Sequence, residues 1–397
     1  MELARIGATP AGGVCRLALT DEEIAARHLL ISWAKELELD VFTDDISNLF
    51  FRLEGANPKL PPIVTGSHID TQPTGGKFDG AFGVVAGFEA VNAIRDTDIA
   101  LERSIEIVAW LNEEGSRFSP GMMGSEAFAK RKSLEEILRV TDSEGVTTEE
   151  ALAKTIAEFP DLPSRPLGFP VASYIEAHIE QAPNLERAGI PVGVVIGIQG
   201  SRRFRVRVEG DEGHAGTLPM AERRDALFAA NEIIAALRHA FAIDDLKFTI
   251  GLFDVSPNAP SVVPANVLFS IDLRHPDIAT LRNSGDAVTE ICESNRGPCS
   301  VTVTEIASDD SLEFPRAVRD SITAAAEALD IASMPILSLA GHDARPLHYH
   351  CESGMIFAPC EGGISHHEAE NAEPSDLAAA TRVLAATIAG MADAASG

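Results

Sequence analysis

Hydrophobic residues in the outer parts of the chain gather in short continuous runs that alternate with longer helical stretches. The runs at 61–64 and 104–111 are apolar along most of their length, which is typical of strands buried on both faces. Further strands are expected at 41–43, 49–51, 174–181 and 336–339, and helices at 21–37, 81–94, 317–329 and 375–391, with a charged helical excursion over 133–159. This pattern predicts an α/β domain with a mixed, mostly parallel sheet flanked by helices.

A different pattern begins near residue 200. Phe204, Val206 and Val208 alternate with arginines, so this strand should have one face on a core and the other in water. The expected order is strand 203–209, helix 225–241, strands 247–253 and 266–274, helix 278–295 and strand 300–305. This is the ferredoxin-like arrangement. We therefore expect 1–200 and 318–397 to form one α/β domain and 201–317 to form an inserted α+β domain.

Length and charge narrow the class of protein. A chain of 397 residues exceeds what one hydrophobic core usually serves, which agrees with two domains. The net charge of −28 argues against a nucleic-acid partner, which would need a basic surface. The apolar runs are too short for a membrane span, and 1–19 does not resemble a signal peptide. The five cysteines form no CxxC pair and are odd in number, so we expect a reducing compartment, the cytoplasm.

A glycine-rich stretch between the expected strand 61–64 and helix 81–94 holds the first candidate site residues. His68, Asp70 and Asp79 fall here, at the carboxyl end of a strand, where ligands bind in open α/β sheets. A histidine and a carboxylate in one loop are the beginning of a metal site. Asp70 could orient the far ring nitrogen of His68. For this loop alone, a polar turn closed by an Asp-Gly pair is the alternative.

Two further stretches carry candidate ligands at strand ends. Glu113 and Glu114 follow the expected strand 104–111, and two adjacent buried carboxylates are costly unless a cation neutralises them. One could bind metal while its neighbour works as a base. His178 alternates with apolar neighbours in 174–181, as a strand residue facing a site would. A solvated acidic turn and a structural histidine are the alternatives.

Six positions in the α/β half share a place after a strand or in a glycine turn, and they are His68, Asp79, Glu113, Glu114, His178 and His366. Three histidines with two of the carboxylates suit two zinc-type ions that share one carboxylate and leave a position open for water. Each position has a structural explanation of its own, but six of them are hard to assemble by chance.

Eight stretches carry a resemblance to a known family: 66–71, 75–83, 112–118, 178–181, 214–217, 272–276, 341–344 and 364–366. They resemble the co-catalytic zinc aminoacylase and carboxypeptidase superfamily. The similarity is greatest to its branch of N-carbamoyl-L-amino acid hydrolases, β-ureidopropionases and allantoate amidohydrolases. At the position of His178 the peptidase branches have a carboxylate, whereas the carbamoyl-hydrolysing branch has histidine.

The resemblance implies the metal ligands and the base. The implied ligands are His68 and His178 for one ion, Glu114 and His366 for the other, and the bridging Asp79 for both. Glu113 is implied as the general base, which takes a proton from the attacking water and passes it to the leaving nitrogen. The implied cofactors are two divalent ions per subunit, zinc first, with manganese or cobalt as the alternatives.

The substrate contacts are also implied by the resemblance. Gln181 and His342 would bind the polar end of the substrate, and Arg274 would pair with its carboxylate. His214 would meet the developing oxyanion from the second domain of the partner subunit. Ser261 stands where the family usually has asparagine, which helps to hold the carboxylate and the oxyanion. Serine is shorter and offers one donor, so the acyl group and the side chain of the substrate stay open.

The implied function is hydrolysis of the C–N bond of an N-carbamoyl or related N-acyl amino acid, a small carboxylate substrate. The inserted segment 201–317 would be a dimerisation and lid domain that joins two chains in a homodimer, and the α/β domain would be catalytic. An allantoate amidohydrolase is one alternative. An aminoacylase or dipeptidase-type exopeptidase is another; His178 argues against it, although Ser261 keeps it open. A non-catalytic metal-dependent binding protein is a third, and Glu113 argues against that.

Overall fold

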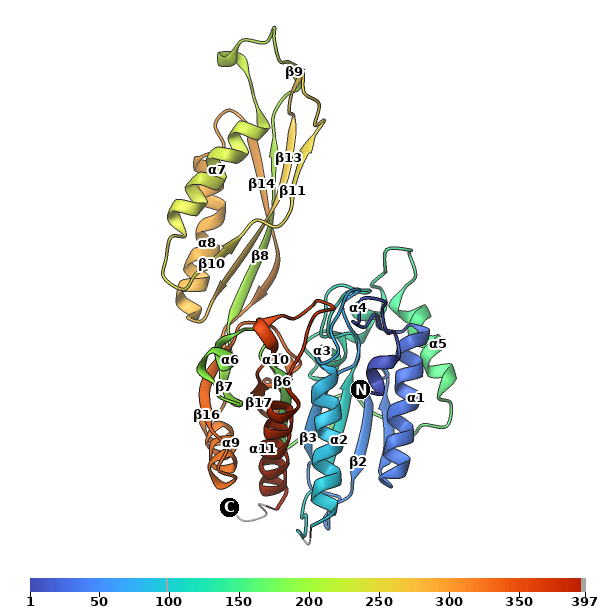
Figure 1. Cartoon of the computed structure of the whole chain (residues 1–397). Helices are drawn as coiled ribbons and strands as arrows, with labels where there is room; N and C mark the ends of the chain where they lie inside the picture. Colours follow the sequence, from blue (N-terminus) through green and yellow to red (C-terminus); the bar gives the residue numbers. More distant parts are fainter. Residues whose placement is uncertain (98, 394–397) are drawn as a thin grey trace. The chain divides into compact units, whose positions relative to one another are not determined.

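The computed structural model describes residues 1–97 and 99–393, which divide into two compact units (Figure 1). The larger unit comprises Met1–Gly197 together with the described chain from Phe314 onward. The smaller unit is Ile198–Glu313. The junctions expected from the sequence, near 200 and 317, lie a few residues later in the chain.

The larger unit is built on one sheet. Its strands are β1 (Asp40–Asp44), β2 (Leu49–Leu53), β3 (Ile63–His68), β4 (Ile105–Trp110), β5 (Ser164–Arg165), β6 (Ser173–Ile179), β7 (Val192–Ile198), β16 (Ser333–Ser338) and β17 (Glu352–Ala358). They pair in the order β7-β17-β6-β3-β4-β2-β1-β5, with β16 also paired to β7. The central strands β17, β6, β3 and β4 run parallel to one another. Residues that follow these strands therefore meet at one edge of the sheet.

Helices lie around this sheet, and the four longest of them share its main hydrophobic core. They are α1 (Asp21–Glu36), α2 (Ala81–Arg95), α3 (Met123–Phe128), α4 (Leu134–Leu138), α5 (Thr148–Glu158), α6 (Asn184–Ala188), α9 (Arg316–Ala328), α10 (Ala344–Leu347) and α11 (Pro374–Asp393). The start of α2 packs very closely on β6, because a Cβ atom at Gly83 would lie 2.3 Å from the carbonyl oxygen of Ala177. This glycine brings the turn before α2 between the ends of β3 and β6.

The smaller unit has an antiparallel sheet with two helices. Its elements are β8 (Gly200–Glu209), β9 (Gly213–His214), α7 (Ala226–Ala240), β10 (Lys247–Thr249), β11 (Phe253–Ser256), β12 (Val262–Val263), β13 (Asn266–His275), α8 (Ile278–Ser294), β14 (Ser300–Asp309) and β15 (Leu312–Glu313). The main sheet has the order β10-β13-β8-β14, with β11 also on β13. Phe204, Val206 and Val208 are buried, as their alternation predicts. The predicted α/β class and the ferredoxin-like order are confirmed.

Several elements differ from the sequence-based expectation. The strand expected at 61–64 is β3, which runs on to His68, so this histidine ends a strand rather than lying in a loop. The central strand β17 and its neighbour β7 were not predicted; β17 begins with polar residues and owes its burial to the strands on both sides. The strand expected at 247–253 breaks into β10 and β11, because Ser270 accepts hydrogen bonds from the backbone N–H groups between them, Gly251 and Leu252.

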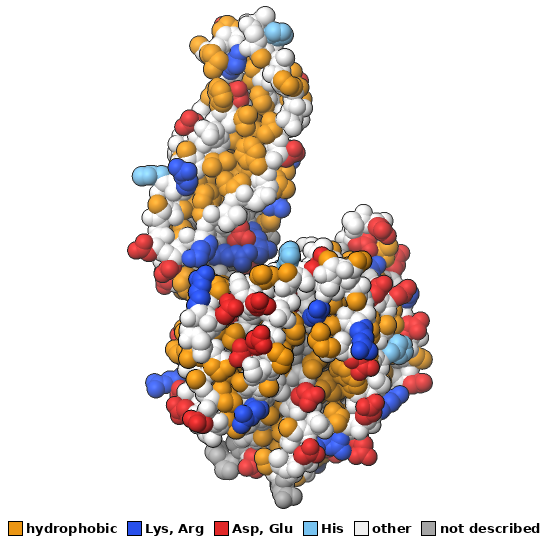
Figure 2. Space-filling view, viewed as in Figure 1, with side chains coloured by type: hydrophobic (Ala, Val, Ile, Leu, Met, Phe, Trp, Pro, Cys, Tyr) orange, Lys and Arg blue, Asp and Glu red, His pale blue; other side chains and the backbone are white. Residues whose placement is uncertain are grey.

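Two general features follow from the described residues. No helix within 1–97 and 99–393 combines the length and the apolar character that crossing a bilayer requires. All five cysteines are free thiols. Asp and Glu side chains are scattered over the visible face of the larger unit (Figure 2), as the net charge of −28 leads one to expect.

Candidate metal centre

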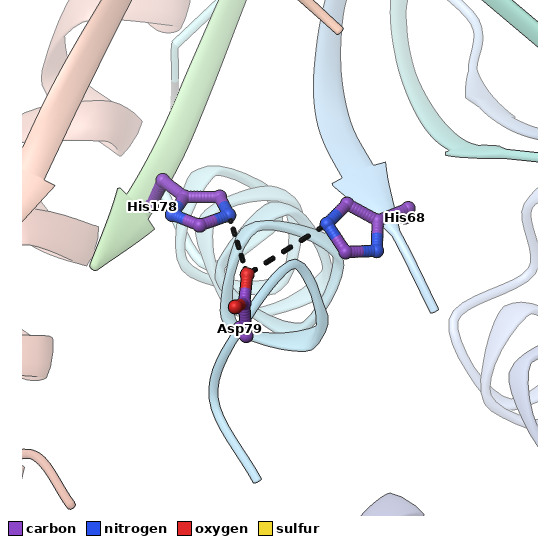
Figure 3. A group of neighbouring side chains, drawn as sticks. All are labelled: His68, Asp79 and His178. Carbon is purple, nitrogen blue, oxygen red and sulfur yellow. Dashed lines mark ion pairs between the residues drawn. The ribbon is translucent and has the colours of Figure 1, made fainter. Parts of the chain in front are cut away.

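Two histidines and one aspartate converge at the carboxyl edge of the large sheet (Figure 3). His68 is the last residue of β3, His178 lies near the end of β6, and Asp79 comes from the turn before α2. The Asp79 Oδ1 atom is 3.2 Å from Nε2 of His178 and 3.8 Å from Nε2 of His68. All three side chains are buried. They form one group of donor atoms close enough to hold a single ion.

Both histidines present the correct ring nitrogen to this group. Nδ1 of His68 donates a hydrogen bond to the carbonyl oxygen of Asp70 (2.9 Å), and Nδ1 of His178 donates to the carbonyl oxygen of Ile179 (2.8 Å). Because a carbonyl can only accept, each Nδ1 carries a proton, which leaves Nε2 as the ring nitrogen that can bind a metal. This is how a protein orients histidine as a metal ligand.

A second group forms on the other oxygen of the same aspartate. Nε2 of His366 lies 3.2 Å from Asp79 Oδ2 and 3.4 Å from Glu114 Oε2. The Glu114 carboxylate is held by the backbone N–H and the side-chain amide of Gln72, at 3.2 and 2.7 Å. His366 has a φ of 54° and its side chain is half exposed. Asp79 therefore lies between two groups of three donors, one oxygen facing each.

Glu113 lies beside the first group without belonging to either. Its Oε2 atom is 3.4 Å from Nε2 of His68, and its side chain is 11% exposed. The carboxylate of Asp70 accepts the backbone N–H groups of Glu113 and Glu114, both at 3.1 Å. The sequence suggested this carboxylate as the partner of the His68 ring, but it lies 3.6 Å from Nδ1 and the hydrogen bond goes to the backbone carbonyl of Asp70. Its main contacts thus fix the turn that carries both glutamates.

The pKa values of the three side chains in the first group, His68, His178 and Asp79, are strongly shifted. Burial lowers the pKa of His68 to about 4. Burial also opposes a charge on His178, but the hydrogen bond and the charge of Asp79 raise its pKa to about 9. Burial alone would raise the pKa of Asp79, yet hydrogen bonds from His178 and His366 hold it well below its usual range. Asp79 is therefore ionised, which is the state that binding a cation requires.

The pKa values of the two glutamates are raised. Burial, followed by the nearby Asp343, raises the pKa of Glu113 well above its usual range. Burial and the charge of Asp79 raise the pKa of Glu114 to about 8. In their ionised forms these buried carboxyl groups repel one another, and divalent cations bound among them would relieve that repulsion.

The donor set fits two divalent ions of the zinc type. Each group offers only imidazole nitrogen and carboxylate oxygen, which zinc, manganese and cobalt accept. Each group supplies three protein ligands, which leaves room for water or substrate, as in catalytic rather than structural zinc sites.

A third cluster of possible ligands has another explanation. Glu176, His178 and His342 also lie within reach of one ion. However, the carboxylate of Glu176 already accepts the Ser67 hydroxyl at 2.6 Å and the Ala344 backbone N–H at 2.9 Å. Glu176 therefore belongs to a buried hydrogen-bond network that joins β6 to β3 and to the start of α10.

Two residues expected to contact substrate lie close to the candidate metal ligands. The side-chain amide of Gln181 donates to Asp79 Oδ2 at 2.9 Å, and its buried Oε1 has no hydrogen-bond partner among the described residues. The ring of His342 packs edge-on against that of His178, with centroids 4.5 Å apart, and its Nε2 contacts the Ser338 hydroxyl at 3.0 Å. Both side chains thus belong to the same neighbourhood as the first group.

The three candidates in the smaller unit fall into two places. His214, in β9, pairs with β12, and Ser261 accepts the backbone N–H of Ala215 at 3.0 Å, so His214 and Ser261 are neighbours. Arg274 is near the other end of β13, opposite Ser201, and two of its guanidinium nitrogens contact Asp272 at 3.0 and 3.1 Å. The structure therefore brings His214 and Ser261 together and separates Arg274 from them.

Sequence reasoning missed three side chains around the candidate metal ligands, namely Gln72, Ser365 and Glu370. Gln72 holds Glu114, as described above. The hydroxyl of Ser365 lies 2.8 Å from Asp79 Oδ2 and 3.2 Å from the Gln181 amide. All three are in irregular segments without periodicity; only the closeness of Ser365 and Glu370 to His366 in the chain could have pointed to them.

A buried aspartate lies between two groups of candidate metal ligands, and a further glutamate lies beside them. An α/β unit that carries such a site and is interrupted by a ferredoxin-like unit is typical of two-metal hydrolases. The model of peptidase family M20/M25/M40 matches residues 64–390, and the chain belongs to this family. It is 36% identical over 394 residues to an N-carbamoyl-L-amino-acid amidohydrolase of Pseudomonas sp. (strain NS671), covering 96% of this chain and 94% of the relative.

Two further relatives agree with this placement. An allantoate amidohydrolase of Escherichia coli (strain K12) is 32% identical over 390 residues, which cover 96% of this chain and 94% of the relative. Among solved structures, an amidase of the hydantoinase/carbamoylase family from Burkholderia multivorans superposes with a TM-score of 0.87 at 39% identity, covering 99% of this chain and 96% of that one. The relatives are thus amidohydrolases, and the family assignment agrees with the resemblance inferred from the sequence.

Proposed function

We propose that this protein is a dimetal amidohydrolase that cleaves the C–N bond of an N-carbamoyl amino acid or a related N-acyl amino acid. The observation that carries the proposal is the position of Asp79 between two groups of three ligands, with Glu113 beside one of them. The similarity to N-carbamoyl-L-amino-acid amidohydrolases points to the ureido group as the part of the substrate that is cleaved. Allantoate hydrolysis is the second candidate, because a relative of that name matches over nearly the whole chain.

Two divalent ions, zinc in the first place and manganese or cobalt as alternatives, are the proposed cofactors. His68, His178 and Asp79 would hold one, and Asp79, Glu114 and His366 the other. When bound, such ions polarise a carbonyl oxygen and lower the pKa of water to near neutrality.

The remaining chemistry falls to the side chains of this chain. Glu113 takes a proton from the attacking water at its carboxylate and delivers it to the leaving nitrogen, so that the C–N bond breaks without expelling an amide anion. Gln181 offers its unpaired Oε1 to the polar end of the substrate. Arg274 pairs with the substrate carboxylate, and His214 donates a hydrogen bond to the developing oxyanion.

We also propose a homodimer through 201–317 and a location in the cytoplasm. The edge strand β14 pairs only with β8 among the described residues, so its outer side offers backbone groups to a second copy. The free thiols of all five cysteines are what a reducing compartment maintains.

A substrate panel tests the reaction. The metal-loaded protein should hydrolyse N-carbamoyl-L-amino acids with a kcat/KM at least tenfold above that for the matching N-acetyl amino acids and dipeptides. Allantoate belongs in the same panel as the second candidate. Ammonia or amino acid release would be measured at equal enzyme and metal concentrations. Highest activity on dipeptides would refute the proposal in favour of an exopeptidase.

Metal removal tests the cofactors. Dialysis against a chelator should abolish activity, and adding zinc, manganese or cobalt should restore it, because the substrate-activating charge would otherwise be missing. His68→Ala should lose bound metal, measured by mass spectrometry of the elements, as well as activity. Full activity of the chelated, metal-free protein would contradict the two-metal proposal.

A further inference from the structure

One buried carboxylate lies among the candidate metal ligands without belonging to either group. The side chain of Glu370 is 2% exposed and accepts the backbone N–H groups of Phe78 at 2.8 Å and Asp79 at 3.0 Å. Both bonds go to its Oε1 atom. They fix the last residues of the turn that delivers Asp79 to the site.

The other oxygen of Glu370 reaches the loop that carries His366. Glu370 Oε2 is 3.0 Å from the hydroxyl of Ser365, the residue immediately before His366. The same hydroxyl is 2.8 Å from Asp79 Oδ2. One carboxylate therefore joins, through short contacts, the backbone of the bridging aspartate to the segment of the half-exposed histidine.

The local backbone makes room for this contact. A Cβ atom at position 76 would lie 2.0 Å from Cδ of Glu370, so only glycine leaves space for the carboxylate there. This close approach places the charge of Glu370 under the Asp79 turn rather than in solvent.

We propose that Glu370 is a positioning residue that sets the second metal group, Asp79, Glu114 and His366, by locking the Asp79 turn to the His366 loop. The first group needs this less, because His68 and His178 are fixed by strands of the central sheet. His366 has no such support, since it lies in a loop with a φ of 54°. The inference rests on the two metal sites of the proposed function and adds a residue that decides how tightly the second ion is held.

Metal titration of variants tests this role. Glu370→Ala should weaken binding of the second ion by about 10–100-fold, the usual cost of losing a group that orients a ligand. The first ion should lose far less. Glu370→Gln should bind both ions nearly as wild type does, because its amide oxygen can accept the same two N–H groups and its amide nitrogen can donate to Ser365. Ser365→Ala, which removes one hydroxyl and leaves the buried carboxylate, should weaken the second ion alone.

Calorimetry and the absorption spectrum of the cobalt-substituted protein would be the readouts. His366→Ala provides the reference spectrum of protein that holds only the first ion. At limiting cobalt, Glu370→Ala should show that reference spectrum, and at saturating cobalt it should regain the wild-type one. Glu368→Gln is the matched control, because Glu368 contacts Thr9 instead of either metal group.

The outcomes separate this role from the metal sites themselves. Wild-type protein that binds fewer than two ions overturns the sites and, with them, the role of Glu370. If wild type binds two ions and Glu370→Ala and Ser365→Ala bind both as tightly as wild type does, the metal sites stand and only the proposed role of Glu370 is wrong. Equal weakening of both ions in these variants, or a Glu370→Gln variant as weak as Glu370→Ala, would also overturn it.

Discussion

Replacing Glu113 by glutamine is expected to lower kcat by about 10²–10⁴-fold, the usual contribution of a general base. Glutamine keeps the size of the side chain but cannot accept a proton. The backbone N–H of residue 113 would still donate to Asp70, so the turn should keep its shape. Metal content should remain near that of wild type, because Glu113 belongs to neither group of ligands.

The neighbouring glutamate is the matched control. Glu114→Gln changes the same functional group one residue away, but this carboxylate approaches Nε2 of His366 and belongs to the second group. It should lose metal along with activity, and added metal should restore part of the rate. Added metal should do nothing for Glu113→Gln. If instead Glu113→Gln loses metal and Glu114→Gln does not, the roles of the two residues are reversed.

The fold was predictable where the hydrophobic pattern is locally strong. The alternation through Phe204, Val206 and Val208 identified a half-buried strand, because side chains alternate between the two faces of a strand and only one face here is apolar. β17 was not predictable in the same way. Only its second half is apolar, and its central place in the sheet depends on pairing with β6 and β7, which lie far away in the chain. Such pairing is a tertiary property that overrides local propensity.

The site was predictable to the level of residue types and less so to the level of contacts. His68, Asp79 and His178 were suggested by their places after or within expected strands, since parallel strands end at one edge. That Asp79 turns one oxygen to each group could not be read from spacing. The hydrogen bonds that the Asp70 carboxylate accepts from the backbone N–H groups of Glu113 and Glu114 could not be read from spacing either. These donors lie 43 and 44 residues away along the chain.

Mixing two inactive variants is expected to restore activity. His214→Ala should lose about 10²–10³-fold in kcat, as enzymes do when an oxyanion donor is removed. Glu113→Gln should be similarly inactive, because it lacks the general base. If His214 of one chain completes the site of its partner, a mixed dimer contains one site with both residues intact. Random exchange makes half of the dimers mixed, each with one intact site in two, so about one quarter of wild-type activity should return.

The smaller unit itself gives the reason to expect sharing. His214 lies beyond the end of β8 that pairs with Asn266, whereas Arg274 pairs with Ser201 at the opposite end. At about 3.3 Å per residue, the length of β13 separates these two ends by about 26 Å, which is several times the length of a carbamoyl amino acid. One substrate therefore cannot contact His214 and Arg274 of the same chain, and two chains related by a two-fold axis can supply one each.

The mixing experiment needs dimers that exchange and a control that cannot recover. After mild denaturation and re-annealing, native mass spectrometry would measure the fraction of mixed dimers. Glu113→Gln mixed with a Glu113→Gln/His214→Ala double variant yields no site with an intact base, so it should stay inactive at the same fraction. Recovery in the first mixture alone is the result that sharing requires. If mixed dimers form and activity does not return, each chain uses its own His214 and the proposed arrangement of the dimer is wrong.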